Sequence, residues 1–262
     1  ITALYETDVP VPKTYGLCED DEIAGTAFFV MDFLDGDLFW NPMIPSLSNQ
    51  DRTEIYQNKN KTLALLHGVD YKKIGLEDYG KPGNYVARQV ARWSKQYRAS
   101  ETDDIEAMNN LIDWLPKNIP DDDETSIVHG DYRLDNMILK NNQVMGILDW
   151  ELSTLGHPIA DFSYHCLSWR TQEAFWNQAK LKELGIPSEK EYMDMYCENT
   201  GKDLSKNWEF YMAFNMFKIA GILQGILGRV RDGTASSKHA EDRGMMVYPL
   251  SEAAWNTIKE NF

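Results

Sequence analysis

Three residues in the middle of the chain carry oxygen atoms at a spacing that suits metal and phosphate chemistry. In the stretch IVHGDYRLDNMIL, Asp131 and Asn136 stand five positions apart, and Asp149 follows thirteen positions after Asn136. An amide carbonyl and a carboxylate are hard oxygen ligands that suit Mg²⁺, which completes its shell with water and phosphate oxygens. A further carboxylate beside such a metal can accept the proton of a substrate hydroxyl. The pattern predicts phosphoryl transfer, with Asp131 as base and Asn136 and Asp149 as Mg²⁺ ligands.

These residues need a loop and a hairpin to bring them together. Gly130 precedes Asp131, and short β-type runs follow at 137–139 and 144–148, so we expect Asp131 and Asn136 to lie on a loop. The letters LKNNQV between the two runs predict a hairpin turn with Asn at its tip. A hairpin folds its ends together, so Asn136 and Asp149 are expected to face one point.

The rest of the chain is expected to be mostly helical. Before the central stretch, we predict a strand at Ala27–Met31, a turn at Asp35-Gly36, and an amphipathic helix at 84–99. Another helix is capped by Ser48 or Asp51 and ends at Gly68, and one more ends at Pro116. Further helices are predicted after Pro158, at about 160–184, 188–199, 207–230 and 236–260.

Composition excludes several classes of protein. The chain has 262 residues, of which 43% are hydrophobic, so we expect a folded core rather than disorder. A net charge of −15 argues against a nucleic-acid partner, and no apolar run approaches the length of a membrane span. The N-terminus shows no signal peptide, and three widely spaced cysteines fit reduced thiols in a cytoplasmic protein. The missing initiator Met favours a piece of a longer gene product.

The motifs, taken in order, resemble one enzyme family. HGDYRLDN is similar to the catalytic loop of the aminoglycoside phosphotransferases, the small-molecule relatives of protein kinases. ILDWE resembles their metal-binding segment, and FVMDFLDG resembles the hinge between their two lobes. VPVPK, YGKPGNYVARQVARWSKQY, DWELSTLGHPIADFSY and GTASSKHA are similar to the kinase-like domain associated with acyl-CoA dehydrogenases. The resemblance covers essentially the whole chain.

The resemblance implies an α+β, protein-kinase-like fold with a mostly helical C-lobe and a small central β-hairpin. Residues 1–34 would be a remnant of the N-lobe that ends in the hinge, and 35–262 would form the C-lobe. It also implies ATP as phosphoryl donor, with adenine bound by the Asp32 carbonyl and the Leu34 N–H, and Asp161 as a brace below the catalytic loop. The family's Gly-rich loop and Lys-bearing strand do not occur before the hinge, so we expect the N-lobe to be largely missing from this chain.

Other polar residues near the motif are expected to have structural roles. His129 should hold the loop by packing and hydrogen bonding, and Arg133 and Asp135 should form an ion pair that fixes it. Glu151 either contacts the metal through water or faces solvent. His157 is expected to cap a helix or to be exposed.

The sequence alone does not identify the substrate that accepts the phosphoryl group. Arg88, Arg92 and Lys95 share one face of the 84–99 helix, which is either simply solvated or the binding surface for an anionic substrate. The resemblance favours a small-molecule kinase acting on the hydroxyl of a hydroxyacyl-CoA or hydroxy acid, with an acyl-CoA dehydrogenase as possible partner or fusion. The negative net charge favours a cation such as an aminoglycoside. A non-catalytic pseudokinase-like binding module is the alternative from another class, and a phosphohydrolase fits the position of Asn136 poorly.

Overall fold

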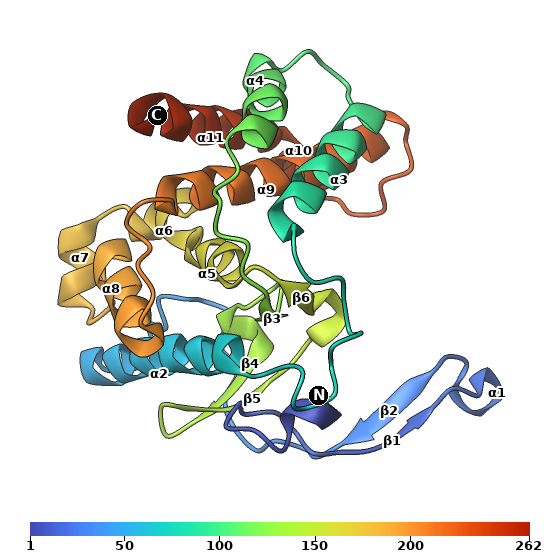
Figure 1. Ribbon diagram of the computed structural model, residues 1–262, viewed down its shortest axis with the longest axis vertical. Helices are drawn as coiled ribbons and strands as arrows, with labels where there is room; N and C mark the ends of the chain where they lie inside the picture. The colour runs from blue at the N-terminus through green and yellow to red at the C-terminus, as the bar shows by residue number, and fades with distance from the viewer.

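The computed structural model describes residues 1–262 except for the side chain of Ala174, and places the central motif between a large helical body and a small β-hairpin (Figure 1). The helices are α1 (Asp21–Ala24), α2 (Asn49–Gly68), α3 (Tyr85–Ala99), α4 (Glu106–Trp114), α5 (Pro158–Cys166), α6 (Ser168–Thr171), α7 (Gln178–Glu183), α8 (Glu189–Thr200), α9 (Trp208–Arg231), α10 (Ala240–Met245) and α11 (Val247–Asn261). Short 3₁₀ turns are η1 (Thr2–Leu4), η2 (Leu115–Lys117), η3 (Leu134–Asn136), η4 (Trp150–Leu152) and η5 (Glu173–Phe175). The strands are β1 (Thr14–Cys18), β2 (Phe28–Met31), β3 (Ser126–Val128), β4 (Met137–Lys140), β5 (Gln143–Ile147) and β6 (Thr154–Gly156).

The expected central hairpin is confirmed as the antiparallel pair β4–β5. Asn141 and Asn142 form its turn with φ values of 51° and 63°, which is the left-handed pair that a tight two-residue hairpin turn requires. The register pairs Met137 with Ile147. Asn136 and Leu148 therefore leave the ladder at the same end, which is how the hairpin brings the two predicted metal-binding segments together.

Two other strand pairs each add one strand that the sequence did not reveal, β6 in one pair and β1 in the other. β3 pairs antiparallel with β6, with Val128 opposite Thr154, so the start of the catalytic loop lies beside the end of the metal-binding segment. β2 confirms the predicted first strand, but it pairs antiparallel with β1, which was not predicted. The β1–β2 hairpin extends away from the rest of the molecule (Figure 1).

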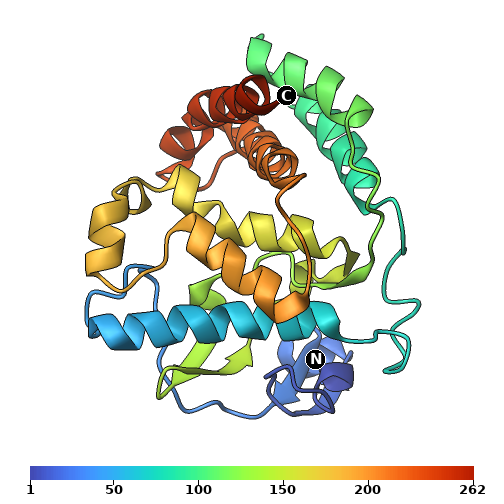
Figure 2. The same cartoon turned by 60° about the vertical axis from the view of Figure 1, so that its left-hand side comes forward.

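The helical body packs around α9. This helix contacts α3, α5, α10 and α11, while α2 packs against α8 and the hairpin (Figures 1 and 2). The 84–99 prediction is confirmed by α3, whose buried side chains Val86, Val90, Trp93 and Tyr97 are those that recur at helical spacing. Ser48 and Asp51 both act at the start of α2, because they form a reciprocal capping box.

Two predicted long helices are divided in the structure. The 160–184 helix is wrong: it is replaced by α5, α6, η5 and α7, and the side chain of Asn177 starts α7 by accepting a hydrogen bond from the Lys180 N–H at 3.0 Å. An Asn side chain competes with the backbone inside helices and favours such caps. The 236–260 helix divides into α10 and α11, because Pro249 has no N–H to bond the Met245 carbonyl.

The α9 helix is long and apolar enough, by length and composition, to cross a membrane. Its 18-residue window has a mean hydropathy of 1.3, and 67% of that window is buried inside the fold. A helix that is apolar on nearly all sides and covered by neighbouring helices is typical of a protein core. We therefore regard α9 as a core helix.

Candidate active site

The catalytic loop brings Asp131 and Asn136 into direct contact. The Asn136 Nδ2 donates to the Asp131 backbone carbonyl at 2.9 Å and to the Asp131 Oδ2 at 3.1 Å. The Asp131 Oδ1 accepts from the Tyr164 hydroxyl at 3.1 Å and lies 3.2 Å from the Arg133 Nε. The predicted ion pair of Arg133 and Asp135 is confirmed, with 2.9 Å between Nη2 and Oδ2. The Asp131 carboxylate is thus held by donors on both oxygens.

The metal-binding segment is tied to this loop on two sides. The Leu148 N–H donates to the Asn136 carbonyl at 2.9 Å, and the Leu148 carbonyl accepts from the His129 Nε2 at 2.9 Å. His129 is fully buried and also accepts from the Asp131 N–H, which confirms its predicted structural role. Asp149 follows Leu148 in a left-handed conformation with φ 61°, and its side chain is exposed. The three predicted residues therefore share one small region.

The residues present suit a hard divalent cation. Because the Asn136 Nδ2 is used by Asp131, its Oδ1 is directed elsewhere, and no donor among the described residues bonds it. Asp149 forms no ion pair within the described part of the chain, so its carboxylate is available too. The described residues contain no group of three or more His, Cys, Asp and Glu side chains placed to hold a metal. One amide oxygen plus one carboxylate is the sparse set that Mg²⁺ accepts alongside phosphate oxygens.

Asp161 holds the catalytic loop from beneath, as its resemblance implied. Its Oδ2 accepts from the His129 N–H at 2.8 Å and from the His67 Nε2 at 3.2 Å, and its Oδ1 accepts from the Gly130 N–H at 2.9 Å. Burial by itself raises the pKa of this carboxyl, but the contacts with His67 and His129 outweigh that effect and leave the pKa below its usual value. Gly130 is required because its φ is +82° and a Cβ would lie 2.7 Å from the Leu152 carbonyl oxygen.

The predicted hinge lies against the hairpin that carries the metal-binding segment. Asp37 exchanges two backbone hydrogen bonds with Leu139 of β4, at 2.7 and 2.9 Å. Leu34 packs over Gly146 of β5, where a Cβ would come within 2.2 Å of the Leu34 Cδ1. Among the described residues, neither the Asp32 carbonyl nor the Leu34 N–H takes part in a hydrogen bond. Both groups remain available to a ligand.

The structure adds two residues that the sequence did not indicate. Tyr164 of α5 reaches Asp131, and the Lys218 Nζ of α9 lies 4.7 Å from the centre of the Tyr164 ring. Burial lowers the pKa of Lys218, and the positive charge of Arg92 lowers it further, whereas the charges of Asp161 and Asp131 raise it. Burial and the charge of Asp131 raise the pKa of Tyr164, which therefore keeps its proton at neutral pH. The sequence offers one signal for Lys218, which is the one charged residue between Phe210 and Gly228.

The basic residues of α3 differ in their contacts. Arg88 is half-buried, and its guanidinium bonds the backbone carbonyls of Gly83 and Lys81, the latter at 2.6 Å. Arg92 and Lys95 are exposed. Arg88 therefore fixes the loop that leads into α3, and the electrostatic influence of Arg92 on Lys218 connects this face with the region of Asp131.

The expectation for His157 is wrong. Its side chain is 2% exposed and forms no cap; its Nε2 donates to the Asp122 carbonyl at 2.6 Å, and its ring stacks on Tyr211. The helix beginning at Pro158 lies on the core, so the side chain of the residue just before it points inward. The Glu151 side chain faces solvent.

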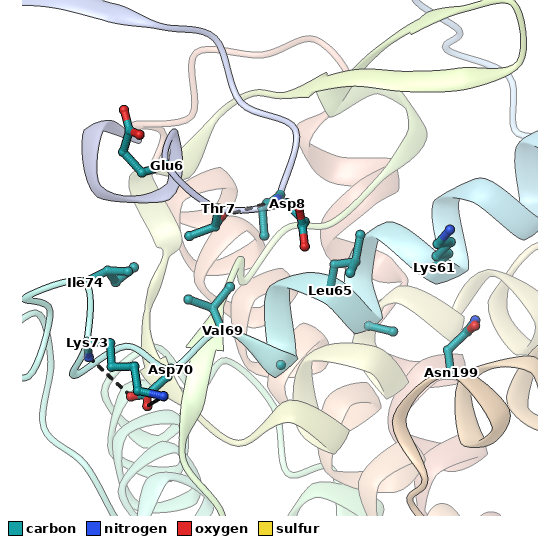
Figure 3. A pocket seen from close by; sticks show the side chains of 13 residues that line it. Glu6, Thr7, Asp8, Lys61, Leu65, Val69, Asp70, Lys73, Ile74 and Asn199 are labelled. Carbon is teal, nitrogen blue, oxygen red and sulfur yellow. Dashed lines mark hydrogen bonds and ion pairs between the residues drawn. The ribbon is translucent and has the colours of Figure 1, made fainter.

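A separate cavity of about 540 Å³ lies between the N-terminal segment and the second half of α2. Figure 3 shows that Asp70 and Lys73 at its rim point toward one another, and they pair at 3.1 Å. Glu6, Asp8 and Lys61 add charges of both signs. None of the predicted site residues lines this cavity.

The fold and the site define a kinase-like phosphotransferase, and comparison with known proteins places the chain. It matches the model of the phosphotransferase enzyme family over residues 1–196, and it belongs to that family. It is 43% identical over 268 residues to acyl-CoA dehydrogenase family member 10 of Mus musculus, a match that covers 99% of this chain and 25% of that protein. Member 11 of the same group in Homo sapiens is 40% identical, with 99% and 34% covered.

A solved structure is also very similar. A protein of Ralstonia eutropha JMP134, provisionally named an aminoglycoside phosphotransferase, shares 50% identity with a TM-score of 0.94, covering 99% of this chain and 81% of that one. The predicted family resemblance is thus confirmed. The chain spans about a quarter to a third of the length of the two dehydrogenase-family relatives.

Proposed function

We propose that this chain transfers the γ-phosphoryl group of ATP to a hydroxyl of a small anionic molecule, such as a hydroxy acid or a hydroxyacyl-CoA. The observation that carries the proposal is the position of Asn136: its side chain bonds Asp131, and its backbone carbonyl bonds Leu148 beside Asp149. A proton acceptor and two oxygen ligands at this spacing are what phosphoryl transfer to an alcohol requires.

Asp131 is the general base. Its carboxylate would accept the proton of the acceptor hydroxyl, while Tyr164, Arg133 and Asn136 keep it oriented. The Asn136 Oδ1 and the Asp149 carboxylate would hold Mg²⁺, which neutralises phosphate charge when bound. Most of the catalytic effect then comes from positioning, which a hydrogen-bonded, buried loop provides.

ATP is the proposed donor, with its adenine against the hinge. The Asp32 carbonyl and the Leu34 N–H would bond the base edge, since both are free among the described residues. Leu34 is itself fixed against Gly146 of the hairpin. The hinge and the metal-binding segment therefore both adjoin the same hairpin, which would hold adenine and phosphates at a fixed separation.

The acceptor is proposed to approach between α3, α5 and α9. Lys218 places positive charge near Asp131, and Arg92 adds positive charge near Lys218. Neither forms an ion pair with a carboxylate in the described part of the chain, which favours an anion there over an aminoglycoside cation. The two relatives named as acyl-CoA dehydrogenase family members suggest that a dehydrogenase is the partner or the fused neighbour. Three free cysteines fit the expected cytoplasmic location.

Replacement of the base tests the assignment. Asp131→Asn keeps the shape and two of the neighbouring contacts but cannot take a proton, so kcat should fall about 10²–10⁴-fold while ATP affinity is unchanged. Asp113→Asn, at an exposed position of α4, is the matched control and should behave as wild type. Transfer by Asp131→Asn at a rate near wild type would refute the role.

Screening identifies the acceptor class. Release of ADP by the full gene product should be compared for hydroxy acids, their CoA esters and aminoglycosides. Arg92→Gln with Lys95→Gln should raise KM for an anionic acceptor and leave ATP hydrolysis in its absence unchanged, whereas Arg88→Gln should also lower stability. A response to aminoglycosides alone would reject the anionic acceptor, and no turnover with bound ATP would favour the pseudokinase-like module.

A further inference from the structure

Lys59 is a buried amine without an acidic partner. It lies on α2, is 3% exposed, and forms no ion pair with a carboxylate among the described residues. Its Nζ lies 4.2 Å from the centre of the Tyr56 ring and 5.9 Å from that of Tyr192. Burial lowers the pKa of Lys59 to about 7, with a small opposing effect of Cys166. A cation in such a position is costly unless an anion compensates it.

The Lys59 side chain lines a cavity beside the catalytic loop. The cavity has a volume of about 120 Å³, and Arg133 and Asp135 of the loop form one of its walls. Tyr56 and Trp169 supply flat apolar surface on the other side. This space suits a small molecule with an acidic head and a short apolar part.

Two cationic side chains of the cavity keep a donor that has no partner among the described residues. His165 also lines it, but its Nδ1 donates to the Tyr132 carbonyl and its Nε2 accepts from the Tyr192 hydroxyl. Arg133 uses Nε for Asp131 and Nη2 for Asp135, so its Nη1 has no partner among the described residues. The Lys59 Nζ and the Arg133 Nη1 are therefore the cationic donors that can bind an anion there, beside the neutral donors of Trp40, Ser168 and Gln172.

We propose that this cavity is a binding site for a small organic carboxylate, with Lys59 as its counter-charge and Arg133 as its second donor. Arg133 also contacts Asp131, so the bound carboxylate lies one side chain away from the proposed base. The carboxylate belongs either to the acceptor itself, an assignment that rests on the proposed function, or to a separate small acid. The site itself requires no phosphoryl transfer.

Competitive labelling of the full gene product tests the site without ATP. Trace reductive methylation at neutral pH, followed by peptide mass spectrometry, reads Lys59 together with the exposed Lys61 two residues away. At an acetate concentration about ten times its Kd, mass action predicts about tenfold slower labelling of Lys59. Labelling of Lys61 should not change, and chloride at the same ionic strength should protect neither lysine.

Two results would overturn the proposal. One is that acetate has no effect on the labelling of Lys59 relative to that of Lys61. The other is that Lys59 resists the reagent under every condition, because small molecules then do not reach its Nζ. Because no turnover is involved, loss of the kinase assignment would leave a positive labelling result intact.

A second set of labelling and kinetic measurements identifies the source of the carboxylate. If it belongs to the acceptor, a short hydroxy acid should protect Lys59 near its KM, and Lys59→Gln should raise that KM while KM for ATP is unchanged. If it is a separate acid, acetate should protect Lys59, and the acceptor should not. Lys61→Gln, on the exposed face of the same helix, is the matched control in both cases.

Discussion

Asp161→Asn is the most direct test of how the catalytic loop is held in place. The carboxylate accepts three hydrogen bonds, from the N–H groups of His129 and Gly130 and from His67, at 2.8, 2.9 and 3.2 Å. An Asn side chain has one acceptor oxygen, so it can keep at most the two hydrogen bonds from His129 and His67. Its NH₂ group would then face the Gly130 N–H, which is also a donor. The change therefore removes one charge-assisted bond and leaves a buried donor without an acceptor.

The size of the effect follows from that geometry. A hydrogen bond to a charged group contributes about 1.5–3 kcal/mol, and a buried unsatisfied donor costs about 1–3 kcal/mol, so the free energy of unfolding should fall by about 3 kcal/mol. Gly130 adjoins Asp131, and a displacement of about 1 Å at a reacting group lowers the rate about 10²-fold. We expect kcat to fall by about that factor.

Urea unfolding and steady-state kinetics measure the two consequences separately. KM for ATP should stay close to its wild-type value, because among the described residues Asp161 forms no hydrogen bond or ion pair with the hinge. Asp113→Asn, at an exposed position of α4, controls for the loss of one negative charge. A variant at position 161 with wild-type kcat would refute the view that Asp161 positions the base, even if its stability were reduced.

Further predictions concern the same network. Gly130→Ala should lower the free energy of unfolding by about 1–3 kcal/mol in urea titrations, because its φ is +82° and the new Cβ would lie against the Leu152 carbonyl. Lys218→Met should raise KM for an anionic acceptor while leaving ATP binding unchanged, as initial-rate kinetics with each substrate would show; equal effects on both substrates would contradict it. The folded-state pKa of Asp161 is depressed, so its contribution to stability is present above about pH 4, the ordinary Asp value, and is lost as pH falls through the lower folded value. Unfolding curves of wild type and Asp161→Asn should therefore converge on acidification.

The parts of the site that the sequence predicted are those fixed by local chemistry. Asp131 and Asn136 lie on one loop, and Asp149 follows the hairpin that begins at Met137, so their spacing along the chain already brings them into one region. The Ser48 cap and the periodic apolar face of α3 are local signals of the same kind.

What the sequence did not predict depends on contacts between distant segments. Lys218 reaches Tyr164 through the packing of α9 on α5, and no local pattern sets that register. β6 is a three-residue strand that exists because β3 lies beside it. The inward position of His157 likewise depends on Tyr211, more than fifty residues away.

The β1–β2 hairpin has a consequence for handling the protein in solution. Tyr15, Leu17, Phe29 and Val30 of its two strands are each at least half exposed, and within the described residues the sheet has only these two strands. Unpaired strand edges bearing aromatic and branched side chains recruit further strands from other copies. Concentrated preparations of these 262 residues should therefore form reversible clusters whose light scattering grows with concentration, and Leu17→Lys should suppress them.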